Sequence, residues 1–301
     1  MENSRLRVFR SVAAHLSFRR AGEELGLTQP AVTLQIKALE AELSVRLLNR
    51  SGNRVSLTPA GVILQRHAEA IAEQLAQALE ELAALRGDHA GEFRLGASTS
   101  IAQYVLPRLL GEFKRQFPNV QVSVISGNTE HIVNQLLSER IAIGLIEGPA
   151  LRREVRTEPL LEDELVLAMA AKHEWADRES ISVEQLKGHP LLLREHGSGT
   201  RQVLETALAK AGLKKSDLNV VMELDSTEAI LSSIEANLGI GFVTRWAVIP
   251  RLPLGRVKTA PVKGLRIRRN FSLLYPAGPK PTGIAGAFRR LALEFRYALP
   301  G

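Results

Sequence analysis

One segment of the chain combines residue types that could perform chemistry. It reads Arg-Glu-His-Gly-Ser-Gly-Thr-Arg over residues 194–201. Glycines around a serine could wrap a phosphate, expose a nucleophile or grip an anion without reacting. A hydrolase elbow needs Gly-x-Ser-x-Gly with an acid and a histidine downstream, whereas this serine lies in Gly-Ser-Gly and no histidine follows His196. The sequence also contains no Gly-x-x-x-x-Gly-Lys-Ser/Thr phosphate loop. The segment therefore favours binding over catalysis, and we expect no enzymatic activity.

Composition narrows the chemistry further. The 301 residues include no cysteine, which excludes disulfides, thiolate nucleophiles and zinc–thiolate sites. The seven histidines are scattered, with no pair at metal-ligand spacing, so we expect neither a metal nor another cofactor. The N-terminus is charged, and no stretch is apolar over the length of a bilayer span. These features predict a cytoplasmic protein with no membrane partner.

The net charge of +7 is unevenly distributed along the chain. Residues 1–66 hold ten Lys and Arg against five Asp and Glu, and residues 67–262 hold 21 against 26. Residues 263–301 hold eight against one. A basic N-terminal module on an acidic body suggests nucleic acid as a partner, but the basic C-terminus means that charge alone does not decide it.

Residues 17–43 predict two short helices around a tight turn. Ser17 and Thr28 are suited to cap the two N-termini, and Gly26 suits a left-handed exit from the first helix. One face of the second helix carries the apolar residues Val32, Ile36, Leu39 and Leu43. The opposite face carries Gln29, Thr33 and Lys37. This layout is typical of a helix that reads base edges and phosphates, although an ordinary helical hairpin with a polar outer face would also show it.

Two further elements follow this hairpin. Residues 49–58 predict two short strands around Gly52-Asn53, and Arg50 and Arg54 beside that turn could contact a phosphate backbone. Residues 58–87 predict one long helix that begins at Thr58-Pro59 and ends at Gly87. Its apolar residues alternate by four and three: Leu64, Ala68, Ile71, Leu75, Ala78, Leu82 and Leu85. Such a heptad seam favours pairing with a second copy of the helix, and the alternative is a helix lying on its own core.

Residues 1–66 closely resemble the winged helix-turn-helix of the LysR-type transcriptional regulators. The matching text is LRVFRSVAAHLSFRRAGEELGLTQPAVTLQIKALEAELSVRLLNR followed by VSLTPAG. The resemblance implies binding to double-stranded DNA at an interrupted inverted repeat, as a homodimer or homotetramer, with RNA polymerase as a further partner. It assigns DNA contacts to Arg19, Thr28, Gln29, Pro30, Thr33, Gln35, Lys37, Arg50 and Arg54. The family usually has an arginine where Leu34 stands and a small hydroxyl residue where Arg19 stands, so a DNA contact has been lost or moved.

After Gly87 the sequence alternates strand and helix signals, which predicts an α/β fold with parallel sheets. A β-run over 91–99 precedes a helix over 100–118, a strand over 119–128, a helix over 129–140 and a short buried strand over 141–149. A second such unit begins at 164–170, and crossings near 162–168 and 264–275 predict two lobes. In the LysR family this body is the effector domain, which resembles periplasmic substrate-binding proteins. The expected domains are a winged helix-turn-helix over 1–58, a dimerisation helix over 59–88, and an effector domain over 89–301 with lobe I at about 91–162 and 268–301 and lobe II at about 163–267.

Ligands of open α/β lobes lie at the carboxyl ends of the strands, against helix N-termini. This rule selects one set of candidate effector-binding residues: Ser98, Thr99, Ser100, Gly127, Asn128, Thr129, Glu147, Arg194, Ser198, Gly199, Thr200, Arg201, Ser226, Thr227 and Thr244. Hydroxyls, backbone N–H groups and arginines describe a site for a small anion, whereas each Ser or Thr taken alone could simply cap a helix.

Phrases in these lobes resemble one branch of the family, the regulators of sulfur assimilation and of carbon fixation. They are ASTSIAQYVLP, IGLIEGP, EDELVLA and LREHGSGTR. The resemblance implies a sulfite- or sulfate-like oxyanion as first choice of effector and a phosphorylated or carboxylic metabolite next. The alternative function is a solute-binding protein with no role in transcription, which the DNA-binding module disfavours.

Overall fold

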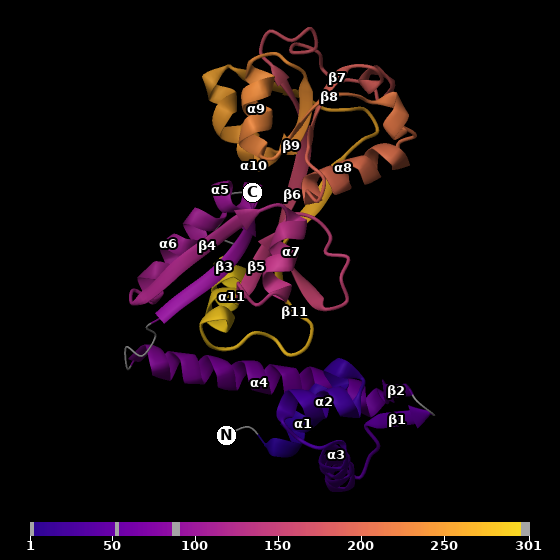
Figure 1. Cartoon of the computed structure of the whole chain (residues 1–301), viewed down its shortest axis with the longest axis vertical. Helices are drawn as coiled ribbons and strands as arrows, with labels where there is room; N and C mark the ends of the chain where they lie inside the picture. The colour runs from indigo at the N-terminus through magenta and orange to yellow at the C-terminus, as the bar shows by residue number, and fades with distance from the viewer. Residues whose placement is uncertain (1–2, 52–53, 86–90, 296–301) are drawn as a thin grey trace. The chain divides into compact units, whose positions relative to one another are not determined.

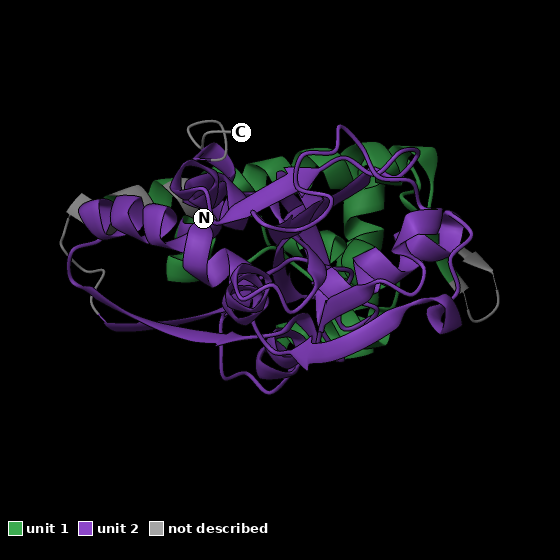
Figure 2. Cartoon of the chain, turned by 90° about the horizontal axis from the view of Figure 1, so that it is seen from above, with its two compact units in different colours: residues 1–89, 277–287 green, residues 90–276, 288–301 purple. Residues whose placement is uncertain are grey.

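The computed structural model describes residues 3–51, 54–85 and 91–295, with helices and strands labelled in Figure 1. The chain divides into two compact units (Figure 2). Unit 1 comprises residues 1–89 and 277–287, and unit 2 comprises residues 90–276 and 288–301.

Unit 1 contains the helices and the hairpin expected at the start of the chain. Its elements are α1 (Ser4–His15), α2 (Phe18–Leu25), α3 (Gln29–Leu43), β1 (Leu48–Ser51), β2 (Arg54–Leu57) and α4 (Pro59–Leu85). Ser17 Oγ accepts from Arg20 N at 3.3 Å and Thr28 Oγ1 from Ala31 N at 3.4 Å, so both predicted N-caps are present. Gly26 takes a φ of 66° after α2, which few residues other than glycine adopt without strain. The predicted helix-turn-helix is confirmed.

The buried stripe of α3 is confirmed at three of its four predicted positions. Val32, Ile36 and Leu39 pack into the core of unit 1. Leu43 is 44% exposed, so its predicted burial was wrong. It occupies the last turn of α3, directly before Ser44 leaves the helix at φ 53°.

The hairpin and the long helix are also present. β1 and β2 pair antiparallel from Leu48 opposite Leu57 to Ser51 opposite Arg54. Thr58 Oγ1 accepts from Gly61 N at 3.0 Å and so caps α4, as predicted. The turn at Gly52-Asn53 and the helix end at Gly87 lie outside the described residues.

Unit 2 alternates strands and helices. Its strands are β3 (Gly91–Ser98), β4 (Val120–Gly127), β5 (Ile143–Ile146), β6 (Val155–Ala170), β7 (Pro190–Arg194), β8 (Asn219–Leu224), β9 (Ile240–Thr244), β10 (Val257–Ala260) and β11 (Ile267–Pro276). Its α-helices are α5 (Thr99–Tyr104), α6 (Leu106–Gln116), α7 (Thr129–Leu137), α8 (Gly199–Lys210), α9 (Thr227–Glu235) and α10 (Arg245–Val248), with α11 (Gly283–Phe295) shared between the units. Short 3-10 helices are η1 (Glu184–Leu186), η2 (Lys215–Asp217) and η3 (Ile249–Leu254).

One sheet runs through the described part of unit 2. Its order is β4-β3-β5-β11-β6-β9-β7-β8, and β10 pairs with β6. β3 pairs parallel with β4 and β5, and β7 pairs parallel with β8 and β9. The two central strands, β11 and β6, pair antiparallel and contain the predicted crossings. The α/β fold class is confirmed, and we use lobe I and lobe II for the two halves as bounded above.

The single helix expected over 100–118 is instead two, α5 and α6. The helices meet at Val105, and Pro107 occupies the first turn of α6, where its missing N–H needs no intrahelical partner. Leu106, Leu109 and Phe113 of α6 are buried, the last with its ring 5.5 Å from that of Phe93 on β3. Because α5 is a separate helix, its N-terminal residues lie directly after the end of β3.

Candidate functional site

The candidate effector site lies at the carboxyl ends of the parallel strands of both lobes. In lobe I, Ser98 ends β3, Gly127 ends β4 and Glu147 directly follows β5. In lobe II, the candidates are Arg194 at the end of β7, Ser198 to Arg201 at the start of α8, Ser226 and Thr227 at the start of α9, and Thr244 at the end of β9. Figure 1 shows β6 running from one lobe to the other, with α7 and α8 on one side of the crossing and α5 and α10 on the other.

Hydrogen bonds join the candidates of the two lobes. Thr200 Oγ1 donates to Glu147 Oε1 at 3.1 Å, and the hydroxyls of Ser100 and Thr227 lie 2.9 Å apart. Asn128 Nδ2 donates to the carbonyl of His196 at 3.2 Å, directly before the Gly-Ser-Gly turn. The candidates are thus brought together, as the strand-end rule predicted.

The backbone of the two lobes approaches closely at a pair of glycines, Gly148 after β5 and Gly199 at the start of α8. A Cβ atom on Gly199 would lie 2.5 Å from Thr129 Oγ1 and 2.6 Å from Gly148 N. The side chain of any other residue at position 199 would displace lobe I. The second glycine of the Gly-Ser-Gly segment therefore allows the two lobes to contact each other there.

A cluster of buried charges lies beneath this contact. Glu147 is fully buried, with Arg194 Nη1 3.6 Å from its Oε1 and Arg269 Nη2 3.6 Å from its Oε2. Arg269 Nε also donates to Asp163 Oδ2 at 2.7 Å, and Asp163 accepts from Thr244 Oγ1 at 2.7 Å. Burial raises the pKa of Asp163, against the opposite pull of Arg269 and Thr244. The arginines that face the cleft are therefore already balanced by carboxylates.

Sequence reasoning missed Asp163 and Arg269. They lie directly opposite each other on β6 and β11, at the two predicted crossings. One signal for them was present in the sequence: each of the two strands expected to cross between the lobes contains a charged residue, one acidic and one basic. Burying either charge without a partner would be costly.

Several buried polar atoms at this place have no hydrogen-bond partner within the described part of the chain. They are Ser98 Oγ, Thr99 Oγ1, Thr129 Oγ1, Glu147 Oε2 and Arg269 Nη2. Buried polar groups in proteins are nearly always satisfied, so an unsatisfied set at converging strand ends points to a ligand or water. Three of the five atoms are hydroxyls that can donate to an anion.

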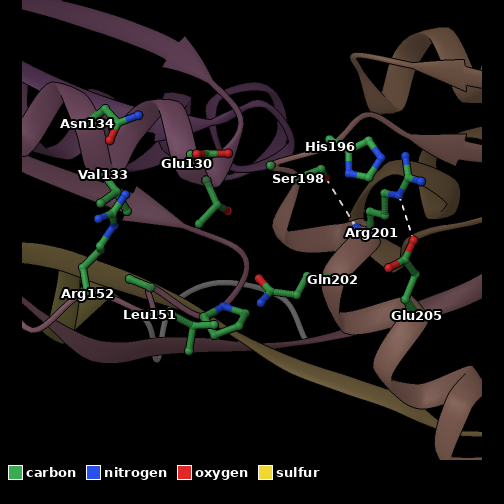
Figure 3. A pocket seen from close by; sticks show the side chains of 14 residues that line it. Glu130, Val133, Asn134, Leu151, Arg152, His196, Ser198, Arg201, Gln202 and Glu205 are labelled. Atoms are coloured by element: carbon green, nitrogen blue, oxygen red, sulfur yellow. Dashed lines mark hydrogen bonds and ion pairs between the residues drawn. The ribbon is translucent and has the colours of Figure 1, made fainter.

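A hollow of about 340 Å³ lies between α7, the loop after β5 and the start of α8, and of the residues with unsatisfied atoms Thr129 lines it. Figure 3 shows Glu130 and Arg152 of lobe I facing His196 and Arg201 of lobe II around it. The guanidinium group of Arg201 already has partners within lobe II, because it pairs with Glu205 at 2.9 Å and donates to the Arg194 carbonyl at 3.1 Å.

Some candidates act as helix caps. Ser226 Oγ accepts from Ala229 N at 3.1 Å and Asn128 Oδ1 from His131 N at 2.9 Å. Thr244 Oγ1 accepts from Trp246 N at 3.3 Å while it donates to Asp163. Ser198 Oγ is 3.5 Å from Arg201 N, at the limit of a hydrogen bond. Gly127 lies under the ring of His131, where a Cβ would come within 2.6 Å of the ring.

The candidate DNA-binding residues lie on α2, α3 and the hairpin. Arg19, Thr28, Gln29, Pro30 and Lys37 are exposed, and Thr33 and Gln35 are half-buried. Arg19 forms an ion pair with Glu23 at 3.5 Å. Leu34 is 68% exposed and, at 100° per residue, lies almost opposite the buried stripe of α3. Only the backbone of Arg50 and Arg54 is described, on β1 and β2.

A winged helix-turn-helix and a two-lobed α/β body define a DNA-binding regulator with a ligand-sensing body. The comparisons with known families agree: residues 4–62 match the bacterial regulatory helix-turn-helix of the lysR family, and residues 86–296 match the LysR substrate binding domain. The chain belongs to the LysR family of transcriptional regulators.

Relatives and solved structures place it within that family. A RuBisCO operon transcriptional regulator of Allochromatium vinosum is 32% identical over 96% of this chain and 94% of its own length. CysL of Bacillus subtilis is 31% identical over 90% of this chain and 89% of its own. The regulatory domain of Synechocystis CcmR in complex with 2-PG is 25% identical, with a TM-score of 0.64, over 70% of this chain and 100% of that domain. The suspected branch, which joins carbon-fixation and sulfur regulators, is thereby confirmed.

Two kinds of feature are absent from residues 3–51, 54–85 and 91–295. No helix there is both long and apolar enough to cross a membrane. No group of three or more His, Cys, Asp and Glu side chains there could hold a metal ion.

Proposed function

We propose that this regulator senses a small anion in the cleft between lobe I and lobe II and transmits its binding to DNA. The observation that carries the proposal is the set of unsatisfied buried atoms beside the lobe contact, chiefly the hydroxyls of Ser98, Thr99 and Thr129. They belong to the ends of adjacent parallel strands, where α/β lobes bind ligands. The alternative of a solute-binding protein with no role in transcription leaves the helix-turn-helix unexplained.

Two sizes of anion are compatible with the cleft. A compact oxyanion such as sulfite or sulfate fits best among hydroxyls whose neighbouring arginines are already paired with carboxylates. A phosphorylated or carboxylic metabolite would extend into the hollow beside Arg152, and the 2-PG complex of the CcmR domain supports that choice. We propose the compact oxyanion first and the larger metabolite second.

Thermal shift of the full chain decides between them. Sulfite, sulfate, thiosulfate, phosphate and 2-phosphoglycolate are added separately, and one class should raise the melting temperature. Thr129→Val and Ser98→Ala, which remove unsatisfied hydroxyls, should abolish most of that rise. Absence of stabilisation by every anion would overturn the proposal.

The proposed mechanism couples lobe closure to DNA binding. An anion that forms hydrogen bonds with groups of both lobes favours the closed arrangement of the lobes. The regulator, as a dimer or tetramer in the cytoplasm, then changes its affinity for an interrupted inverted repeat of DNA. Coupling of this kind is typically about 1–3 kcal/mol, which is roughly a 5- to 150-fold change in apparent affinity. Contact with RNA polymerase would follow from the same change.

The proposed base contact of Gln29 has a direct test. Gln29→Ala should cost about 1–3 kcal/mol of binding free energy on the cognate site and little on scrambled DNA, because base contacts alone discriminate sequence. Gln116→Ala, which removes an exposed glutamine from α6, is the matched control. Equal losses on both DNAs would assign Gln29 to the phosphate backbone.

A further inference from the structure

A second hollow lies on the opposite face of the crossing strands. It has a volume of about 400 Å³ and is lined by residues of α5, α6, β6, α10 and β11. The two hollows share no lining residue. Arg269 reaches Thr200 and Glu147 on the cleft side, and its neighbour Arg268 lines this second hollow.

The hollow has an excess of positive charge. Of its charged lining residues, Arg266 pairs with Glu164 at 3.0 Å and Asp163 pairs with Arg269. The side chains of Arg108, Arg245 and Arg268 have no hydrogen-bond or ion-pair partner among the residues that the structure describes. Against these three positive charges stands one carboxylate, Glu162, that likewise has none there.

The hollow also has an aromatic wall. Trp246 of α10 lines it and is half-buried, and Ile249 and Pro250 extend the apolar surface. Tyr104 lies on the lobe I side, where its hydroxyl donates to Glu228, and burial raises its pKa to about 12, so that the phenol keeps its proton. The flat indole ring can stack on an aromatic ring of a ligand, and the neighbouring unpaired guanidinium groups can bind a negative charge on the same ligand.

From this combination we propose a second ligand site that takes an aromatic or heteroaromatic anion, with its ring on Trp246 and its carboxylate or phosphate on Arg108, Arg245 and Arg268. Arg108 belongs to lobe I and Arg245 to lobe II, so this ligand bridges the lobes as a cleft effector would. It therefore acts as a co-effector at a place separate from the cleft, on the far side of β6 and β11.

Tryptophan fluorescence gives a local readout, because the chain has only two tryptophans. Trp175 is buried in lobe II, stacked on His189 with ring centroids 4.1 Å apart, and Trp246 lines the hollow. Phenyl phosphate is the probe, and inorganic phosphate and benzyl alcohol each carry one half of its chemistry. We expect saturable quenching by phenyl phosphate that disappears in Trp246→Phe, and binding at least about tenfold weaker for each half-probe.

Calorimetry with phenyl phosphate supplies a second measurement that does not depend on quenching. Arg108→Gln combined with Arg245→Gln should raise the dissociation constant about tenfold or more, because charge-assisted hydrogen bonds are lost. Thr129→Val alters the proposed cleft and should leave this constant unchanged, so failure of this site and failure of the cleft are distinguishable. No heat of binding up to about 10 mM, or no effect of the arginine substitutions, would overturn the proposal.

Discussion

At the scale of single residues, Glu147 is the buried charge on which most other groups of the site depend. Two arginines lie 3.6 Å from its oxygens, and Thr200 donates to it. Removing the charge of Glu147 leaves buried arginines without their carboxylate partner. Glu147→Gln should therefore lower the free energy of unfolding by about 3–5 kcal/mol. Urea denaturation measures this loss. Added sulfate should stabilise the variant more than the parent protein, since two arginines then lack a shared carboxylate.

The same substitution at Glu164 is the control for this prediction. Glu164 pairs with Arg266, whose side chain is 63% exposed, and such pairs contribute at most about 1 kcal/mol. A Glu147→Gln variant as stable as Glu164→Gln would show that the buried cluster does not depend on that charge.

At the scale of elements, the sequence predicted helices and strands where local chemistry is explicit. Caps at Ser17 and Thr28 and the glycine at 26 located α2 and α3 because these residues act within a few positions of themselves. The pairing of Asp163 with Arg269 was not predictable in the same way, since 106 residues separate them and only the register of β6 against β11 brings them together. The close approach of Gly199 to Gly148 was missed for the same reason.

The contact between the loop after β5 and the start of α8 yields a prediction about closure. Gly199→Ala places a methyl group against Gly148 and Thr129, and overpacking of this kind costs about 1–3 kcal/mol. The lobes should separate there, so the amide of Glu130, which donates to the Gly197 carbonyl at 3.2 Å, should exchange its hydrogen faster. Hydrogen exchange measures this, and anion binding should weaken in parallel.

Gly111→Ala is the matched substitution for this experiment. It lies in α6, where an added Cβ meets no atom within 4 Å. Alanine should be neutral or stabilising there by up to about 1 kcal/mol, because glycine is a poor helix former. If both alanines behaved alike, close contact at Gly199 would not explain the effect.

The loops of lobe II contain a pair of histidines with a pH-dependent role. His173 Nε2 and His189 Nε2 lie 2.9 Å apart, beside Trp175. Burial lowers the pKa of both rings below the usual 6.5. The unfolded chain therefore binds these protons more readily, and the stability present above about pH 6.5 is lost as pH falls through that value toward the folded pKa. Melting temperature measured from pH 7.5 to 5 should fall less steeply in the double variant His173→Gln, His189→Gln. An unchanged slope would contradict this account.

At the scale of the whole molecule, apolar side chains are exposed on α4 and on the edge strand β8. Ile71 and Leu82 of the heptad seam on α4 are 52% and 48% exposed. β8 lies at one edge of the sheet with Val220, Val221 and Met222 each about two-fifths exposed. Apolar seams and uncovered edge strands are normally buried by association, which supports the proposed dimer and tetramer.

The dimer can be tested at its seam. Ile71→Asp places a charge among residues that a coiled coil would desolvate, so the dimer should dissociate at micromolar concentration, as sedimentation velocity measures. Ala70→Asp introduces the same charge about 100° around α4, at an exposed position outside the seam, and should leave the mass unchanged. Because one helix-turn-helix reaches a single half-site, the dissociated Ile71→Asp protein should also lose preference for the inverted repeat over a lone half-site. A monomeric parent protein, or an Ile71→Asp protein that keeps the dimer mass and this preference, would exclude the seam on α4 as the dimer contact.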